Sequence, residues 1–346
     1  MAYTDIDNPS ETAFNTVLYT GNGGTQAVTG VGFKPDFVWL KSRNNAYNHF
    51  LYDVVRGQGK FVQTDSESAE GDSDQMTSFD NDGFTVTATG GAATNGNGST
   101  TVAWNWLADT SFNNDASGTG IGSIDSVGSF NNTNGCSIVT YTGTGSNGTV
   151  KHGLNTAPYF IAIRSRSNAG SDWHVYHNSL GGTKFLRLNT TAAAETNSAA
   201  AWNNTAPTSS VFSLGTGNNV NGSSRTYIAY CFAEKQGYSK ISSFVGNGAN
   251  NFIYTGFSPA WVMIKKTDDT HDWHIFDNKR DVYNERDSWL EANNTQAETT
   301  SSNYVVDFLS NGFKTGSGSG LNGSGETFIY MAFAENPFVT STGVPA

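Results

Sequence analysis

Four aspartates lie close together in the first quarter of the chain: Asp72, Asp74, Asp80 and Asp82. Carboxylate oxygens are the ligands that calcium prefers, and Asp80 and Asp82 form the better candidate pair because Gly83 follows them. The stretch matches no complete EF-hand loop, and Asp-x-Asp-Gly is also typical of a hairpin turn. We therefore expect no resident cofactor, with calcium at Asp80 and Asp82 as the alternative.

Three glutamates recur at matching places in otherwise variable segments, each directly after an alanine: Glu70, Glu195 and Glu298. One interpretation is structural, because a carboxylate that accepts hydrogen bonds from backbone N–H groups can fix a loop. The alternative is contact with a partner or with a glycan hydroxyl, since loops carry much of the binding in proteins. We favour the structural role and keep the three glutamates as candidate ligand-binding residues.

Aromatic side chains could stack on sugar rings if they were exposed. Most tryptophans of this chain fall in recurrent apolar segments and are expected in the core, where aromatic burial stabilises a small sandwich. Trp202 and Trp289 lie outside that pattern. They are therefore the best aromatic candidates for glycan binding.

Catalytic constellations are not evident in the sequence. A glycosidase needs two carboxylates that flank one bond, and no such pair stands out; Asp53 and Asp277 align with His177. A nucleophile elbow with a plausible histidine and a phosphate-binding loop are also missing. His174 and His274 each follow a tryptophan, but one histidine per copy is too few for zinc, so we expect packing roles. We therefore predict a protein without catalytic activity.

One strand-like segment recurs three times, at 35–41, 158–164 and 259–265. Each copy begins with proline, which cannot donate to a sheet ladder and belongs at the first position of a strand. The aromatic and β-branched run that follows predicts a strand buried on both faces. The basic residue that ends each run is expected to mark where the strand reaches water.

Other features recur around this strand. Each copy opens with a strand that ends in a Gly-x-Gly turn and closes on a strand of alternating aromatic and small residues, which is typical of a half-buried strand. Asp82-Gly83 and Asn311-Gly312 predict hairpins. The chain is therefore predicted to be all-β, with three tandem β-sandwich or jelly-roll domains built from an internal repeat, at 14–107, 136–233 and 239–334.

The remaining segments are interpreted as connections. Residues 1–13 are an N-terminal arm and 335–346 a C-terminal tail, while the short linker 234–238 holds the second and third domains together. The polar linker 108–135 is expected to be flexible or to lie along the surface. The alanine-rich run 192–201 aligns with loops of the other copies and is expected to be a loop.

The composition argues against several classes of partner. The formal net charge is −11, and no basic stripe offers the clustered lysines and arginines that nucleic acid binding requires. No apolar run approaches the ~20 residues of a membrane span, and the polar, acidic start predicts no signal peptide. Cys136 and Cys231 could be neighbours in a sandwich, but we expect free thiols from folding in a reducing cytoplasm.

Four motifs of the first copy carry a resemblance to a known family. They are Gly-Phe-x-Pro-Asp-Phe-Val-Trp-Leu-Lys, Leu-Tyr-Asp-x-Val-Arg-Gly, Ser-Phe-Asp-x-Asp-Gly-Phe-Thr and Val-Ala-Trp-x-Trp, at 32–41, 51–57, 78–85 and 102–106. They resemble a repeated domain in virion structural proteins of marine tailed bacteriophages, which looks like a lectin-type (concanavalin A-like) jelly roll. The later copies match less well, because Arg-Gly and Asp-Gly are lost or altered there.

This resemblance implies a non-catalytic virion surface protein, made in the cytoplasm of the host bacterium. Its implied partners are other virion proteins, further copies of itself and a host-surface glycan. Head decoration or fibre and tail fibre remain open as placements. The missing heptads and the length spent on compact domains favour a decoration protein docked through a domain face. The alternative function is a polysaccharide depolymerase of the phage tail.

Overall fold

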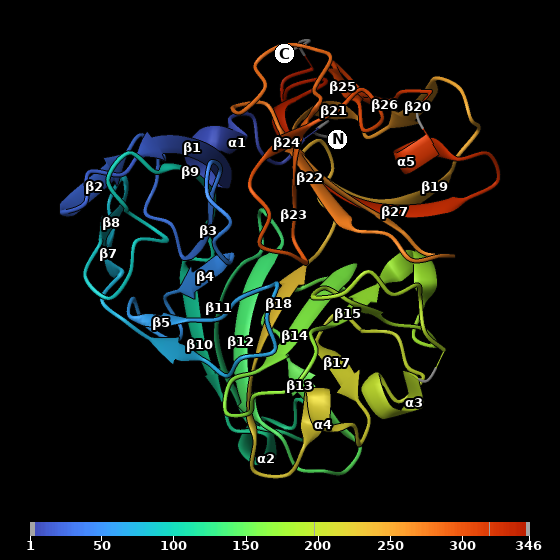
Figure 1. Cartoon of the computed structure of the whole chain (residues 1–346). Helices are drawn as coiled ribbons and strands as arrows, with labels where there is room; N and C mark the ends of the chain where they lie inside the picture. The colour runs from blue at the N-terminus through green and yellow to red at the C-terminus, as the bar shows by residue number, and fades with distance from the viewer. Residues whose placement is uncertain (1–3, 197, 318, 344–346) are drawn as a thin grey trace.

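The computed structural model describes residues 4–196, 198–317 and 319–343. Nearly all of its regular structure is β, which confirms the predicted all-β class. The strands form three lobes around a common centre (Figure 1). We call them module 1 (β1–β9), module 2 (β10–β18) and module 3 (β19–β27). The predicted domain boundaries and internal repeat stay predictions, but the strand order within the modules can be compared directly.

Module 1 is a sandwich of two antiparallel sheets. The larger sheet has the order β1 (Phe14–Thr20), β9 (Thr100–Trp106), β3 (Phe37–Ser42) and β4 (Phe50–Asp53), and the smaller has β2 (Thr25–Thr29), β8 (Gly83–Thr87) and β7 (Met76–Asp80). A third pair, β5 (Lys60–Phe61) and β6 (Gly71–Asp72), completes the module. The Pro-led strand β3 is buried throughout, as predicted.

Modules 2 and 3 repeat the order of module 1: the opening strand, the closing strand, the Pro-led strand and the strand that follows it in sequence. In module 2 the large sheet is β12 (Cys136–Thr142), β18 (Thr226–Phe232), β14 (Phe160–Ser165), β15 (His174–His177) and β16 (Leu186–Arg187), faced by β13 (Gly148–Lys151) and β17 (Val211–Leu214). In module 3 it is β19 (Ser239–Val245), β27 (Thr327–Pro337), β21 (Phe257–Lys266), β22 (Trp273–Asp277), β23 (Ser288–Glu291) and β24 (Thr299–Thr300), faced by β20 (Asn251–Tyr254), β26 (Gly312–Thr315) and β25 (Val306–Leu309). Strand β27 continues three residues beyond the predicted boundary at 334.

The segment 108–135, which was expected to be flexible or to lie along the surface, is an ordered extension of the module 2 sheet. It contains β10 (Thr110–Asn114), α2 (Ala116–Thr119) and β11 (Ser126–Asn131), and the two strands extend the module 2 sheet beyond β12. Asp115 caps α2 by accepting from the backbone N–H groups of Ser117 and Gly118. The polar composition of this segment is explained by β10, most of whose residues are exposed to solvent.

The other helices are single turns. The predicted loop 192–201 ends in one of them, so that expectation was wrong in part. Its last residue, Ala201, is buried in the apolar interior of module 2, and its carbonyl accepts from the backbone N–H of Gly215. The single turns are α1 (Pro9–Thr12), the 3-10 turn Asn178–Leu180, α3 (Ser198–Ala201), α4 (Asn218–Asn221) and α5 (Ser319–Asn322).

The closing strands are buried on both faces, not half-buried as predicted. In β9, Trp104 and Trp106 face the centre of the molecule while Ala103 faces the interior of module 1. In β18, Phe232 faces the centre and Cys231 faces the interior of module 2. The aromatic residues that the sequence pattern assigned to single sandwiches therefore meet between the modules.

A central aromatic core joins the three modules. It consists of Phe14, Trp106, Phe232, Trp261 and Phe333, whose ring centroids lie between 4.9 and 6.4 Å apart in contacting pairs. Each aromatic side chain buries a large apolar area, so this core contributes strongly to stability. Because every module supplies part of it, the modules are expected to depend on one another for folding.

Cys136 and Cys231 are free, as expected. They lie on neighbouring strands, but Cys136 is paired with Phe232 rather than with Cys231. Because side chains alternate between the faces of a sheet, Cys136 points to the central core and Cys231 into module 2.

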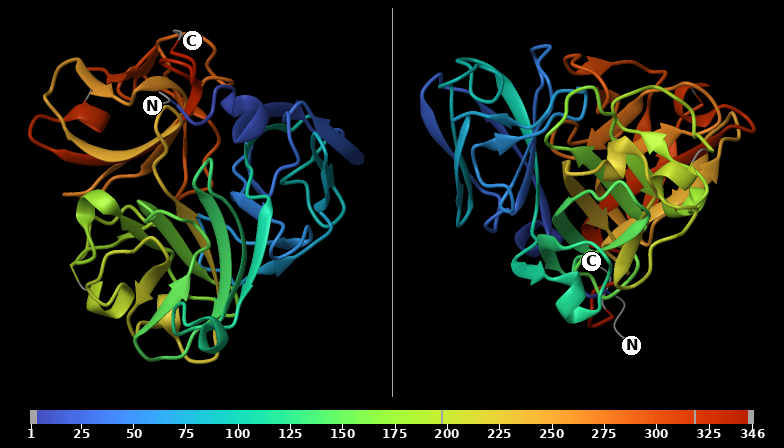
Figure 2. Two further views of the ribbon diagram at one scale, coloured as in Figure 1. Left: turned by 180° about the vertical axis from the view of Figure 1, so that it is seen from behind. Right: turned by 90° about the horizontal axis from the view of Figure 1, so that it is seen from below.

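The N-terminal arm closes the ring of modules. The described part of the arm lies against module 3 (Figure 2). Helix α1 contacts both β1 and β27. The Asp7 carboxylate accepts hydrogen bonds from the backbone N–H and hydroxyl of Ser341 at 2.6 and 2.5 Å. Among the described residues, no helix has the length and apolar character needed to cross a membrane.

Candidate functional site

Neither tryptophan proposed for glycan stacking presents its ring to solvent. Trp202 is 1% exposed and packs edge-on against Tyr176 inside module 2, with ring centroids 5.9 Å apart. Trp289 is also buried and packs against Tyr304 at 4.7 Å. The prediction was wrong because these segments fold back onto their sandwiches, which a linear pattern does not reveal.

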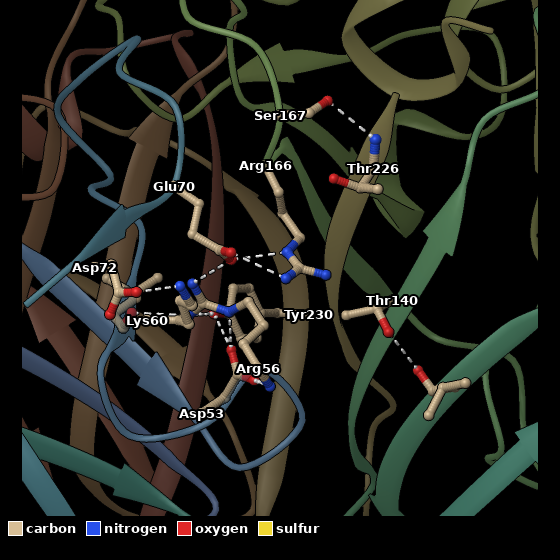
Figure 3. Close-up of polar contacts among 12 residues, drawn as sticks. Asp53, Arg56, Lys60, Glu70, Asp72, Thr140, Arg166, Ser167, Thr226 and Tyr230 are labelled. Carbon is tan, nitrogen blue, oxygen red and sulfur yellow. Dashed lines mark hydrogen bonds and ion pairs between the residues drawn. The ribbon is translucent and has the colours of Figure 1, made fainter. Parts of the chain in front are cut away.

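Glu70 joins modules 1 and 2 through guanidinium groups (Figure 3). It accepts from Arg166 Nε and Nη2 at 2.7 and 2.9 Å, and Arg56 Nη1 lies 3.3 Å from its Oε2. Its backbone N–H also donates to the carbonyl of Arg166 at 2.8 Å. Its side chain therefore links two modules. The structural interpretation had supposed that it binds backbone N–H groups of its own loop, and it does not.

Arg56 connects this network to the interior of module 1. It is buried and donates from Nε to Asp53 Oδ2 at 2.5 Å. Its Nη2 reaches across to the hydroxyl of Tyr230 in module 2 at 2.9 Å, and that hydroxyl donates to Asp53 at 2.8 Å. The motif Asp-x-x-Arg thus builds a closed set of charge-assisted hydrogen bonds, the stronger class of such bonds.

The junction of modules 3 and 1 repeats this arrangement. Glu298 accepts from Arg43 Nη2 at 2.7 Å and from Arg280 Nη1 at 3.0 Å, while Arg280 Nε donates to Asp277 at 2.6 Å. The indole N–H of Trp104 donates to Asp277 at 3.0 Å. It replaces the Tyr230 hydroxyl, which donates to Asp53 at the junction of modules 1 and 2. Two of the three module boundaries are therefore closed by the same Asp–Arg–Glu–Arg network.

The junction of modules 2 and 3 lacks it. His177 and Leu180 have the same spacing as Asp53 and Arg56, and His177 Nε2 lies 3.3 Å from the carbonyl oxygen of Tyr330. Glu195 does not cross the boundary; it pairs with Arg187 of its own module at 2.9 Å. A backbone bond from Ala194 to Thr267 crosses instead. Ala194, and not Glu195, therefore occupies the position of Glu70 and Glu298 in the structure.

The basic residues that end the Pro-led strands are buried rather than at the water boundary. Each donates to a backbone carbonyl of another module: Lys41 to Thr295 at 3.1 Å, Arg164 to Ser68 at 2.5 Å and Lys265 to Thr191 at 3.0 Å. Burial lowers the pKa of Lys41 and Lys265 to about 8 and that of Arg164 to about 10. The expectation failed because the neighbouring module covers the strand end. Since each contact runs from one module to the next, the three junctions form a closed head-to-tail ring.

The electrostatics of the glutamates point to structure rather than acid catalysis. Burial by itself opposes ionisation of Glu70 and Glu298, but hydrogen bonds and charge from the paired arginines outweigh it and hold each pKa below its ordinary value. A carboxylate of this kind stays ionised and its lone pairs are occupied by donors. It is poorly suited to give a proton to a substrate.

The aspartates of the calcium hypothesis are engaged in hydrogen bonds. Asp82 accepts from the backbone N–H groups of Gly30 and Gly32, which lower its pKa, and Asp80 accepts from the Thr85 hydroxyl at 2.7 Å. Asp80 pairs with Gly83 across the predicted hairpin. Within the described residues, no group of three or more histidine, cysteine, aspartate or glutamate side chains is placed to hold a metal ion. The geometry supports the hairpin.

Sequence reasoning missed a buried asparagine that locks the Gly-x-Gly turn of every module. Asn95, Asn221 and Asn322 each accept from the backbone N–H of the residue between the two glycines. The first glycine of each turn packs directly on the backbone after that asparagine, where a Cβ would lie 2.2–2.4 Å from a carbonyl oxygen. The signal was present as an Asn-Gly pair before each closing strand.

The open surface of the molecule offers a pocket of about 990 Å³ between modules 2 and 3. Asn155 and Ser209 line it from module 2, Tyr254 and Phe338 from module 3, and Lys235 from the connection between them. A smaller groove of about 480 Å³ is lined by residues of module 2. Two of them, Arg166 and Thr226, lie near Glu70 at the junction of modules 1 and 2 (Figure 3). The larger pocket is the better candidate binding site, because exposed aromatic and polar groups converge there.

This chain belongs to a family described as "Domain of unknown function (DUF7483)". The family model matches residues 8–337. The match runs without a break from α1 to the end of β27, so the DUF7483 unit contains all three modules and all three junctions. None of the curated proteins matches the sequence.

One further carboxylate in the DUF7483 unit has a different environment. Glu291 of module 3 is partly buried, which raises its pKa. Its Oε1 lies 3.2 Å from the indole nitrogen of Trp289 and 3.5 Å from Nε2 of His274, whose pKa burial lowers to about 3. The ring of Tyr304 stacks on His274 at 4.6 Å. Its Oε2 accepts from Asn294 Nδ2, so both carboxylate oxygens are engaged, and the raised pKa is the one property that Glu291 shares with a general acid.

Proposed function

We propose that the protein is a non-catalytic surface component of a bacteriophage virion, which presents lectin-like sandwich modules to other virion proteins and to a host-surface glycan. The motif resemblance supplies the phage context. The observation that carries the proposal is the closed ring of junctions, in which Glu70 and Glu298 tie neighbouring modules together. A body held in this way keeps its loops in fixed positions, which suits a component of an assembled particle.

Placement on the particle can be tested by imaging virions labelled with antibody to this protein. Label over the head, with no effect of free protein on adsorption to cells, supports a decoration protein. Label at the tail tip, with free protein blocking adsorption, supports a receptor-binding fibre. Virions that carry no label, while an antibody to a known coat protein labels them, would refute the proposal.

The surroundings of Glu291 favour a second candidate function, a polysaccharide depolymerase. A raised pKa is a feature expected of an acid that protonates a glycosidic oxygen, although the Trp289 ring beside Glu291 is itself buried. Incubation with capsule or cell-wall glycan separates the two functions. Oligosaccharides released by the wild type and not by Glu291→Gln would establish the enzyme, whereas no release by either supports the non-catalytic role.

A further inference from the structure

The pocket between modules 2 and 3 has aromatic groups on one side. Tyr254 and Phe338 are 61% and 42% exposed, although large apolar side chains of this protein are mostly buried. Tyr254 leans over Gly256, where a Cβ would lie 3.4 Å from its hydroxyl, and the backbone N–H of Phe338 donates to the Gly256 carbonyl. The two aromatic residues are therefore held near one another at the pocket wall. Exposed rings beside polar groups provide an apolar surface for a ligand with hydroxyl groups.

Two lysines, Lys235 and Lys240, line the pocket. Lys240 is paired with Glu234 at 3.1 Å, which neutralises both. For Lys235, by contrast, no side-chain hydrogen bond or ion pair is found within the described part of the chain; the charge of Asp5 acts on it, and partial burial lowers its pKa. An ammonium group in a partly desolvated position gains from a carboxylate ligand.

We propose that this pocket binds an oligosaccharide containing a carboxylated sugar, with sugar rings against Tyr254 and Phe338 and the carboxylate at Lys235. The assignment rests on the proposed surface role and names the ligand class for it. Asn155 and Ser209, which line the pocket from module 2, supply groups for sugar hydroxyls. The overall net charge of −11 opposes an anionic ligand, but at physiological salt charges farther than ~8 Å are largely screened, so the nearby groups decide. Of these, Glu234 is paired with Lys240, and the ligand carboxylate must compete with Asp5 for Lys235.

The probe is a short oligogalacturonate, titrated into the full chain and followed by calorimetry. The same oligosaccharide with its carboxylates methyl-esterified is the matched ligand, because it keeps the rings and loses the charge. We expect the acid to bind at least ~10-fold more tightly than the ester, with affinity falling as salt is added. Lys235→Gln should remove that difference, and Tyr254→Ala should weaken both ligands about 10-fold.

Tyr283→Ala is the control variant, since Tyr283 is 83% exposed and does not line the pocket. It should bind like the wild type, and unchanged thermal unfolding of all three variants shows that they fold. Equal affinity for acid and ester would overturn the carboxylate assignment. Binding of neither, or binding that survives both pocket variants, would overturn the site itself. Virion labelling tests the surface role separately, so either idea can fail while the other stands.

Discussion

Glu298 accepts hydrogen bonds from two arginines that lie far apart in the chain, Arg43 of module 1 and Arg280 of its own module, at 2.7 and 3.0 Å. Arg280 is itself buried against Asp277. One carboxylate thus compensates two positive charges at the boundary where the ring of modules closes. Glu70 does the same between modules 1 and 2.

Replacing Glu298 by glutamine should destabilise the protein by about 1.5–3 kcal/mol, because Arg43 and Nη1 of Arg280 lose a charged acceptor while Arg280 keeps Asp277. Urea unfolding at neutral pH measures the change. Asp72→Asn is the control, since the Lys60–Asp72 pair is largely exposed and its loss should cost less than about 1 kcal/mol. Equal, small effects of the two substitutions would show that the junction network contributes little.

The sequence was sufficient for the features that depend on neighbours in the chain. The Pro-led strands, the Asp82-Gly83 hairpin and the all-β class follow from local patterns. The sequence patterns did not predict which strand faces are covered by another module. Lys41 was interpreted as the exposed end of a strand and Trp104 as a core residue of one sandwich. Both contact module 3, and these contacts leave no signal in the local sequence.

The candidate site shows the same limit. Trp202 and Trp289 were chosen because they fall outside the recurrent pattern, yet a side chain in a variable segment can still fold inward. Tyr254 and Phe338 gave no local signal, since the pocket exists only where modules 2 and 3 meet. The spacing of residues along the chain does not predict which distant segments come into contact.

The buried asparagines provide a test of the turn lock. Asn221→Ala should cost about 2–4 kcal/mol, because it leaves the Thr144 N–H and the carbonyls of Ser146 and Gly215 without partners. Asn250→Ala, at an exposed position of the corresponding turn in module 3, should change stability by less than about 0.5 kcal/mol. A loss at Asn221 no greater than at Asn250 would mean that the turn holds without the lock.

The central aromatic core predicts cooperative unfolding of all three modules. Phe333→Ala should cost about 3–5 kcal/mol, since its ring contacts Phe14, Trp106, Phe232 and Trp261. Calorimetry should show one transition, shifted as a whole to lower temperature. If only one of several separate transitions moved, the modules would be independent and the shared core would not couple them.

The buried lysines predict a particular dependence of stability on alkaline pH. The pKa of Lys265 is lowered to about 8 by burial, and the same holds for Lys41. Between about pH 8 and pH 10 the unfolded chain therefore binds protons that the native protein has released, so these groups make the free energy of unfolding rise with pH. Cys136 and Cys231, whose pKa values burial raises, act in the opposite direction, and the test must therefore compare variants.

Lys265→Met should reduce the lysine contribution to that rise by roughly half, since Lys41 remains, and the Lys41→Met, Lys265→Met double variant should remove it. Urea unfolding at several pH values across this window measures the slope, with exposed Lys279→Met as the control that leaves it unchanged. The variants lose the bonds from Lys265 to the carbonyls of Thr191 and His271, which lowers stability at every pH without altering the slope. An identical slope in wild type and double variant would show that both lysines stay charged in the native protein, with their carbonyl partners sufficient to hold the charge.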